Sequence, residues 1–416
     1  MGIANLISSA LGGNLPVAIQ AYDGSQVGPT TAPATITVRS PNAISRIAHS
    51  PGELGFGRAY VAGEIDIDGD IYSALSMAGR IDAGISRRSL IPLVRAAGLG
   101  SLRRLPPPPQ EARLHGRRHG RGRDASAISH HYDVGNDFYA LVLGPAMTYS
   151  CAVWASPEVG LEAAQYAKHE LVCRKLALKP GMRLLDIGCG WGGMVRHAAR
   201  HHGVIAVGVT ISGRQAEWAR GEAKSQGLSD QIEIRVQDYR DIPDGPFDAI
   251  SSIGMLEHVG IGELPRYVAM CRRLLRPGGR LLNHGITRPT PSAPIGNDSF
   301  VGSFVFPDAE LPEAGALVSL THAAGIEVRN VENLREHYAL TLRAWVTNLE
   351  ANWSECVALA GEGRARVWRL YMAGSALEFE AGPIQVQQVL GVRTENGRSG
   401  MALRPDWEGS VENKSP

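Results

Sequence analysis

The run Leu184-Leu-Asp-Ile-Gly-Cys-Gly-Trp-Gly-Gly193 constrains the fold more than any other part of the sequence. An apolar stretch typical of a strand leads into a glycine-rich turn that opens a helical pattern. Glycines let the backbone approach a ligand closely, and the start of a helix offers free N–H donors. The run therefore predicts a ligand held at the carboxyl end of a strand.

Strand-like runs alternate with helical patterns around this turn. Such alternation predicts an α/β fold of the Rossmann-like kind, with a parallel sheet covered by helices on both faces. The expected strands are Arg183–Ile187, Val204–Thr210, Ile232–Val236, Phe247–Ile253 and Arg280–His284.

The turn also matches the GxGxxG pattern of nicotinamide-dependent oxidoreductases, through Gly188, Gly190 and Gly193. Such an enzyme needs an acidic residue about 20 positions later to hold a ribose, but the second expected strand ends at Thr210 without one. Asp238 follows the third strand instead, where a methyltransferase grips its adenine. A methyltransferase is the favoured interpretation, and an oxidoreductase is the alternative.

Composition and linker-like segments indicate two domains. At 416 residues and 44% hydrophobic content, the chain can bury more than one core. A proline- and arginine-rich segment over Leu102–Asp124 resists both helix and packing, so it predicts a linker. We expect a small α+β domain over 1–101, a linker over 102–125 and a catalytic domain over 126–416, with a lid-like insertion near 288–312.

In the first domain, the patterns predict a strand over Ala34–Ser40, a helix over Pro41–His49 and another strand over Ala59–Asp68. In the linker, the basic residues suit either a solvated spacer or a contact with anionic lipid. Those residues are Arg103, Arg104, Arg113, Arg117, Arg118, Arg121 and Arg123.

Cysteine usage and hydropathy bear on location and partners. The five cysteines form no CxxC pair and no local zinc pattern, which predicts a reducing cytoplasm and no metal site. No apolar run is long enough to span a bilayer. A net charge of +1 gives no field to recruit nucleic acid. The expected location is the cytoplasm, with peripheral attachment to the inner face of the membrane.

Several separated motifs together resemble the cyclopropane fatty acid synthases and their mycolic acid relatives. They are HHYDVGNDFYALVLGPAMTYSCAVW from His130 to Trp154, then LDIGCGWGG, VGVTIS, QDYRD and GMLEHVG. The resemblance implies a class I fold that binds S-adenosylmethionine, a lipid-presenting amino-terminal domain, an unsaturated phospholipid acyl chain as substrate and a homodimer. It also implies bicarbonate as the base that removes a proton after methyl transfer.

The resemblance assigns residues to two sites. It places bicarbonate against Cys151, Glu257, His284, Ile286 and Tyr338. It places S-adenosylmethionine against Tyr149, Ser150, Asp186, Gly188, Gly190, Gly192, Thr210, Gln215, Gln237 and Asp238. Without the resemblance, the sequence would indicate that Cys151 is a small buried hydrophobic residue, that His284 ends a strand and that Tyr338 is part of the core face of a helix.

The product stays open between alternatives. Proton loss from the added methyl gives a cyclopropane, the first expectation. Loss from a neighbouring chain carbon gives a methylene branch, a precursor of 10-methyl fatty acids such as tuberculostearic acid, and the Ala21–Ser25 segment resembles actinobacterial relatives of that kind. A small-molecule methyltransferase and a non-catalytic lipid-binding module are the remaining alternatives.

Overall fold

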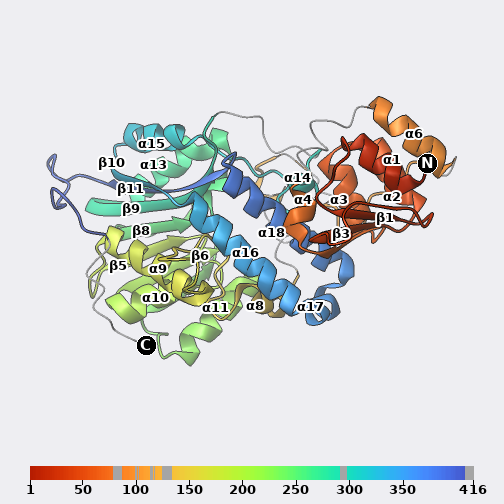
Figure 1. Cartoon of the computed structure of the whole chain (residues 1–416). Coiled ribbons are helices and arrows are strands. Elements are labelled where there is room, and N and C mark those ends of the chain that lie inside the picture. The colour runs from red at the N-terminus through yellow and green to blue at the C-terminus, as the bar shows by residue number, and fades with distance from the viewer. Residues whose placement is uncertain are drawn as a thin grey trace. The chain divides into compact units, whose positions relative to one another are not determined.

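The structure is a computed structural model that describes residues 1–77, 87–98, 101, 103–112, 116, 118–123, 134–290 and 298–407. The chain divides into two compact units (Figure 1). Unit 1 comprises Met1–His115, Ile295–Pro307 and Leu349–Leu377, and unit 2 comprises Gly116–Pro294, Asp308–Asn348 and Glu378–Pro416. The division differs from the predicted domains because two later segments belong to unit 1. The predicted domain roles stay predictions.

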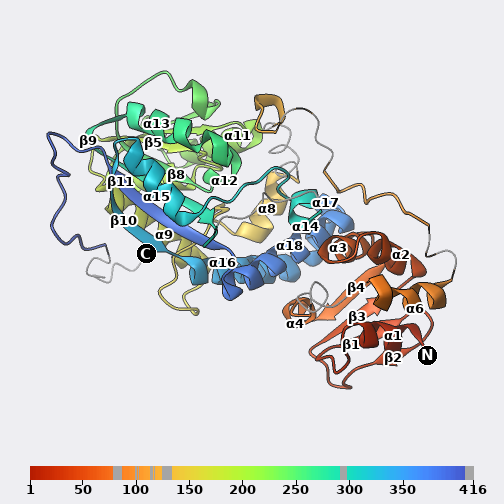
Figure 2. The same cartoon turned by 90° about the horizontal axis from the view of Figure 1, so that it is seen from above.

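Unit 1 contains a four-stranded sheet in the order β2-β1-β3-β4, flanked by short helices (Figure 2). Only the β1–β3 pair is parallel. The strands are β1 (Ala18–Ala21), β2 (Gln26–Val27), β3 (Ala34–Val38) and β4 (Ile65–Gly69). The helices are α1 (Ile3–Ala10), α2 (Pro41–His49), α3 (Glu53–Val61), α4 (Ile71–Leu75), α6 (Arg87–Ala97), α14 (Phe300–Phe304), α17 (Trp353–Ala360) and most of α18 (Glu362–Ala381).

The strand predicted over Ala59–Asp68 is wrong in its first half. Residues up to Val61 belong to α3, and the strand begins only at Ile65. The helix ends because Gly63 takes a positive φ of 71°, which reverses the chain so that the Glu64 N–H donates to the Ala59 carbonyl. The β-prone side chains of Tyr60 and Val61 are instead buried from the helix.

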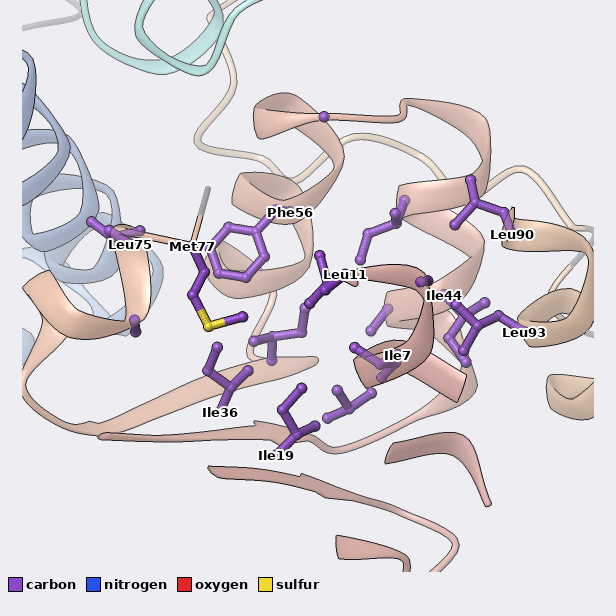
Figure 3. Close-up of a pocket in the computed structure, with 17 residues that line it drawn as sticks. Ile7, Leu11, Ile19, Ile36, Ile44, Phe56, Leu75, Met77, Leu90 and Leu93 are labelled. Atoms are coloured by element: carbon purple, nitrogen blue, oxygen red, sulfur yellow. The ribbon is translucent and has the colours of Figure 1, made fainter. Parts of the chain in front are cut away.

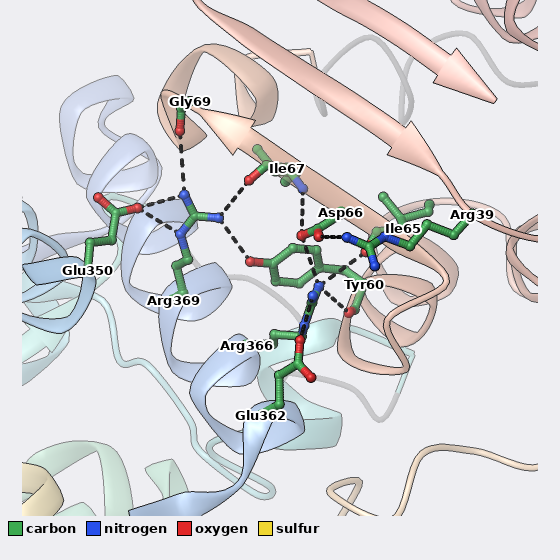
Figure 4. Close-up of polar contacts among 10 residues, drawn as sticks. All are labelled: Arg39, Tyr60, Ile65, Asp66, Ile67, Gly69, Glu350, Glu362, Arg366 and Arg369. Carbon is green, nitrogen blue, oxygen red and sulfur yellow. Dashed lines mark hydrogen bonds and ion pairs between the residues drawn. The ribbon is translucent and has the colours of Figure 1, made fainter. Parts of the chain in front are cut away.

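Two arginines of α18 tie this late helix into unit 1 (Figure 4). Arg366 NH1 lies 3.2 Å from Asp66 Oδ1, and Arg369 Nε donates to Glu350 Oε1 at 2.7 Å. Arg369 NH1 also donates to the Tyr60 hydroxyl at 3.1 Å. Both side chains are nearly buried, and each charge has an acidic partner. The arginines therefore belong to the structure of this unit.

The insertion predicted near 288–312 falls partly outside the described residues, which resume at Asp298. Phe300 stacks on Phe304 at 4.9 Å between ring centroids, and both side chains are buried. A Cβ at Gly57 would lie 2.3 Å from the Phe300 ring, so α14 packs directly on α3. These aromatic residues are part of the core of unit 1, and the lid-like role of the insertion stays a prediction.

Unit 2 contains a seven-stranded sheet in the order β10-β11-β9-β8-β5-β6-β7. The strands are β5 (Arg183–Ile187), β6 (Ile205–Thr210), β7 (Ile232–Val236), β8 (Phe247–Ile253), β9 (Leu275–Thr287), β10 (Glu327–Asn333) and β11 (Gln385–Val392). The five predicted strands are parallel, as expected. The prediction missed β10 and β11, which pair antiparallel beyond β9.

Helices cover both faces of this sheet (Figure 1). Leu184 packs in a core with residues of α9 and α10, whereas its neighbour Leu185 packs with residues of α13. The helices are α8 (Asn136–Leu143), α9 (Leu161–Leu176), α10 (Gly193–His202), α11 (Gly213–Ser225), α12 (Leu256–Val259), α13 (Leu264–Leu274), α15 (Ala314–Ala323) and most of α16 (Arg335–Ala351). The predicted α/β class is confirmed. No helix among the described residues is long and apolar enough to cross a membrane.

Candidate active site

The glycine turn between β5 and α10 combines positive φ angles, close packing and open space. Gly188, Gly190 and Gly192 all have positive φ angles, of 77°, 53° and 79°. A Cβ at Gly193 would lie 2.8 Å from Thr148 Oγ1, so that glycine permits close packing. A Cβ at Gly190 would meet no atom within 4 Å. The space above Gly190 is therefore open to a ligand that approaches the bare backbone.

The predicted cofactor residues stand at the carboxyl ends of β5, β6 and β7, on the edge where a parallel sheet binds ligands. Thr210 Oγ1 donates to Gln215 Oε1 at 3.0 Å, and the Gln237 N–H donates to the Thr210 carbonyl at 2.9 Å. The first bond joins the end of β6 to α11, and the second joins the ends of β6 and β7. Asp238 instead faces Arg240, whose Nε lies 2.8 Å from its carboxylate.

Asp186 lies at the end of β5 and is wholly buried. Its carboxylate accepts a hydrogen bond from Ser251 Oγ of the neighbouring strand at 2.6 Å. Burial raises the pKa of Asp186 to about 6, although this hydrogen bond and the charge of Lys168 oppose the rise. A carboxylate in this setting favours a nearby cation or donor.

Lys168 of α9 is a buried cation that the sequence analysis missed. Its side chain is almost fully buried, and Nζ donates to Ser150 Oγ at 3.0 Å. Burial lowers its pKa to about 8. Its charge acts on the pKa values of Cys151, Asp186 and His284, so the lysine lies among residues of both predicted sites. One signal was present in the sequence, because Ala164, Lys168 and Val172 share one helical face at four-residue spacing.

Glu257 of α12 is held by one oxygen only. Oε1 accepts the Ile286 backbone N–H at 2.6 Å, while the buried Oε2 has no hydrogen-bond partner among the described residues. Burial raises the pKa of Glu257 to about 7. The close approach of α12 to β9 depends on Gly285, where a Cβ would lie 2.9 Å from the Leu256 side chain. The Ile286 N–H thus positions Glu257, and its expected contact with bicarbonate stays a prediction.

A buried relay determines which nitrogen of His284 carries a proton. Lys175 Nζ, which can only donate, contacts Gln388 Oε1 at 2.8 Å. The amide nitrogen of Gln388 therefore faces His284 Nδ1, at 3.2 Å, and must donate to it. Burial, with the charges of Lys168 and Lys175, lowers the pKa of His284 well below its usual range, so the ring is neutral.

The neutral ring must then carry its proton on Nε2. That nitrogen is buried and has no hydrogen-bond partner in the part of the chain that the structure describes. Its N–H is a donor prepared for a ligand. Gln388 stands directly opposite His284 in the β11–β9 pairing, and sequence reasoning missed it along with the whole of β11.

Cys151 and Tyr338 have different surroundings. The buried Cys151 thiol donates to the Ala152 carbonyl at 3.2 Å, and burial raises its pKa. Tyr338 lies in α16, and its ring centroid is 6.1 Å from that of Trp345. The ring centroid of Tyr149 lies 5.1 Å from that of the same Trp345. An aromatic wall thus connects residues of the two predicted sites.

The structure therefore joins most of the predicted residues through a few contacts. Lys168 lies among Ser150, Cys151, Asp186 and His284, while Glu257 holds Ile286 directly. Gln237 and Asp238 lie farther along the sheet edge, at β7. The arrangement provides an open glycine turn and, among the described residues, two buried polar atoms of Glu257 and His284 that lack partners.

Comparison with known proteins decides the family. A family model described as mycolic acid cyclopropane synthetase matches residues 119–389. The chain belongs to this family. It is thus a methyltransferase of the cyclopropane synthase family.

Similar proteins match most of the chain, beyond the residues that the family model covers. A probable fatty acid methyltransferase of Mycobacterium tuberculosis is 44% identical over 409 residues, covering 95% of this chain and 96% of that protein. The cyclopropane-fatty-acyl-phospholipid synthase of Escherichia coli is 35% identical over 373 residues, covering 88% and 90%. The similarity therefore includes the amino-terminal region as well as the catalytic fold.

Solved structures match the catalytic part. The cyclopropane synthase MmaA2 of Mycobacterium tuberculosis has a TM-score of 0.61 at 32% identity, covering 65% of this chain and 98% of that one. The mycolic acid cyclopropane synthase CmaA1, solved in complex with SAH and CTAB, also has a TM-score of 0.61 at 32% identity, covering 64% and 98%. The family and its SAH-bound structural neighbour support the use of S-adenosylmethionine by this chain.

Proposed function

We propose that this enzyme transfers a methyl group from S-adenosylmethionine to the cis double bond of an unsaturated acyl chain, on a phospholipid, and removes one proton to give a cyclopropane. The observation that carries this proposal is two buried atoms, Glu257 Oε2 and His284 Nε2, that have no hydrogen-bond partner among the residues the structure describes. A buried polar atom is destabilising unless a partner is supplied. One atom is an acceptor when ionised and the other is a donor.

Bicarbonate fits this pair by its chemistry. It supplies a mild base, and it has both a hydroxyl to donate and oxygens to accept. Glu257 would accept the hydroxyl proton through Oε2, and His284 would donate its Nε2–H to an oxygen. Lys168 would add positive charge beside both the anion and the cofactor. The residues proposed to hold S-adenosylmethionine are those that line the turn and the ends of β6 and β7.

The chain's own residues also protect the reaction from water. Glu257, His284 and Cys151 are buried, and the rings of Tyr149, Tyr338 and Trp345 add an apolar wall. A carbocation formed beside that wall would meet aromatic faces rather than solvent. The proton then has one acceptor to reach, which is the anion held by Glu257 and His284.

We propose that unit 1 receives the acyl chain, as the resemblance implies. An apolar cavity of about 80 Å³ lies between its sheet and helices (Figure 3). Ile19 and Ile36 line it from the strands, while Phe56 and Leu93 line it from helices. A cavity with such walls is dry and accepts an apolar group in place of water. This supports a lipid-presenting role for the unit.

Attachment to an anionic membrane is a weaker proposal for this chain. Arg113 and Arg117 lie outside the described residues. Arg121 pairs with Asp241, and Arg123 pairs with Asp308, so those charges are already neutralised in unit 2. Arg103 and Arg104 are exposed. Vesicle binding by the full chain at low and high salt tests the proposal, which predicts binding that salt weakens. A homodimer also remains a prediction.

The test of the function uses the full chain, vesicles of unsaturated phospholipid and S-adenosylmethionine with an isotopically labelled methyl group. We expect labelled acyl chains whose mass rises by one CH₂ unit, with a rate that falls in bicarbonate-depleted buffer and recovers on adding bicarbonate. Vesicles of saturated phospholipid are the matched control. Unlabelled lipid, with label found only in small molecules, would refute the proposal.

The product needs a second measurement because a cyclopropane and a methylene branch have the same mass. Proton NMR of the isolated acyl chains distinguishes ring protons from vinylidene protons. Ring protons support the cyclopropane. Vinylidene protons replace it with a methylene-branched product and leave the rest of the proposal standing.

A further inference from the structure

A second cluster of reactive side chains lies between α9 and α10, apart from the site described above. The Cys173 sulfur and one ring nitrogen each of His197 and His202 all lie within 4.8 Å of one another. Thiolate and imidazole are the ligands that zinc prefers in proteins. The three residues come from two helices of unit 2, with Cys173 in α9 and both histidines in α10.

The carboxylate of Glu170 lies against the two histidines of the cluster. Its Oε2 lies 3.2 Å from His197 Nε2 and 3.0 Å from His202 Nε2. Ligand atoms at about 2.0 Å from a tetrahedral ion are about 3.3 Å from one another. The two oxygen–nitrogen distances are therefore already close to the edges of such a tetrahedron.

The surroundings suit a bound ion. Arg174 Nε donates to the other oxygen of Glu170, Oε1, at 2.9 Å, which turns Oε2 toward the imidazoles. Carboxylate ligands of metals are commonly fixed by such an outer hydrogen bond. Cys173 is fully buried, whereas the side chains of Glu170 and His202 are each 19% exposed, so an ion has access from one side.

We propose that Cys173, His197 and His202 bind a divalent cation of the zinc class that joins α9 to α10, and that the ion draws in the neighbouring carboxylate of Glu170 as its fourth ligand. Binding requires each imidazole to coordinate through the nitrogen that carries no proton and the thiol to release its proton to solvent. The bound charges then balance, because thiolate and carboxylate together neutralise the ion. With Glu170 bound, four protein ligands leave no open position for catalysis, so the site is structural.

The location gives the site a consequence for the glycine turn. α10 begins at Gly193, the last glycine of that turn, and α9 carries Lys168 and Lys175. An ion that clamps the two helices would stabilise both. The sequence hid the site because its ligands come in pairs from two separate helices, with no CxxC motif to mark them.

Zinc binding by the full chain is the test, after removal of any histidine tag and treatment with a chelator. We expect calorimetry to give one zinc ion per chain, cobalt to give a thiolate-to-metal absorption band, and zinc to raise the melting temperature. Cys173→Ser and His202→Gln should each weaken zinc binding by about tenfold or more. His322→Gln, which changes an exposed histidine of α15, is the matched control and should bind zinc as the wild type does.

Two results would overturn the proposal. One is that the full chain binds no zinc, or binds only zinc that His322→Gln abolishes. The other is that Cys173→Ser and His202→Gln both bind zinc as the wild type does. Either outcome would make the cluster a hydrogen-bonded tie in which both imidazoles donate to Glu170. His202 lies at a partly exposed helix end, so His202→Gln carries the test even where Cys173→Ser fails to fold.

Discussion

Two buried arginines of unit 1 and two buried groups of unit 2 have opposite surroundings. In unit 1, Arg366 and Arg369 each have an acidic partner and further acceptors. In unit 2, Glu257 Oε2 and His284 Nε2 are buried without a partner among the described residues. Unit 1 does leave the Ser40 hydroxyl unpaired, but that group carries no charge.

The difference separates structural groups from groups that await a ligand. Burying a charge or a strong donor without a partner is destabilising by about 1–3 kcal/mol or more. Where partners are present, the group contributes to the fold. Where they are absent at a sheet edge that binds ligands, a ligand supplies them. Substitution of these groups should therefore lower stability in unit 1 and lower turnover in unit 2.

Glu257→Gln should have the largest effect, lowering kcat by about 10²- to 10⁴-fold, because the amide cannot accept a proton from the bound base. Affinity for S-adenosylmethionine should change little. Initial rates with saturating lipid and cofactor titrations measure the two effects. Glu233→Gln, an exposed carboxylate of β7, is the control. A Glu257→Gln enzyme with full turnover would remove Glu257 from the proposed site.

Glu257→Gln should also raise the free energy of unfolding at high pH. Burial raises the pKa of Glu257 from 4.5 to about 7, so the folded state favours the protonated acid. Its contribution to stability is fully present below about pH 4.5 and is lost as the pH rises through about 7. Glu257→Gln should therefore match the wild type at low pH and exceed it at pH 8 by on the order of 3 kcal/mol. Denaturant unfolding at several pH values measures this.

Arg369→Leu should cost about 3 kcal/mol of folding stability, because it leaves the Tyr60 hydroxyl and the Ile67 carbonyl without their donor and Glu350 without its partner. Affinity for S-adenosylmethionine should stay unchanged. Arg266→Leu removes an exposed ion pair and should cost less than about 1 kcal/mol. Equal melting temperatures for the two variants would contradict the structural role of Arg369.

Gln388→Glu should lower kcat by about 10- to 100-fold through the tautomer of His284. A carboxylate there can still pair with Lys175, but it accepts the Nδ1 proton, so Nε2 loses its N–H. Nitrogen NMR of labelled histidine reports the tautomer independently of activity. Gln385→Glu makes the same exchange at the first residue of β11 and is the control. An unchanged His284 signal would refute the relay, whatever the rate.

The sequence was informative where local chemistry decides structure. The apolar parallel strands and the glycine turn were predicted to within a residue or so at most boundaries. β10 was missed because it is half exposed and polar, and β11 because Gln387 and Gln388 interrupt its apolar pattern. Lys168, Lys175 and Gln388 gain their roles only when α9 and β11 pack beside β9. That packing joins residues more than 100 positions apart, which no local pattern records.

Gly190→Ala should weaken S-adenosylmethionine binding by about tenfold, since a Cβ would enter space that no protein atom occupies. It also introduces strain at a positive φ. Gly227→Ala is the matched control, because Gly227 likewise has a positive φ, of 69°, and open surroundings. Calorimetry gives the S-adenosylmethionine affinity of both variants, and a loss in Gly190→Ala alone is due to ligand contact rather than to backbone strain. Similar affinities for both variants would show that the open space is not the cofactor site.

Cys151→Ser should have the smallest effect, with kcat within about threefold of the wild type, because the thiol is a weak donor already engaged by protein carbonyls. Its sulfur lies 3.2 Å from the Ala152 carbonyl and 3.6 Å from the Leu334 carbonyl. Burial raises the pKa of the thiol, so it stays protonated and cannot serve as the base. A serine hydroxyl can donate to the same carbonyls, at a stability cost of about 1 kcal/mol. Cys271→Ser makes the same exchange at a buried position in the α13 core and should show a similar loss of stability with normal turnover. Initial rates that fall more than tenfold in Cys151→Ser alone would place this thiol among the groups that act on the bound anion.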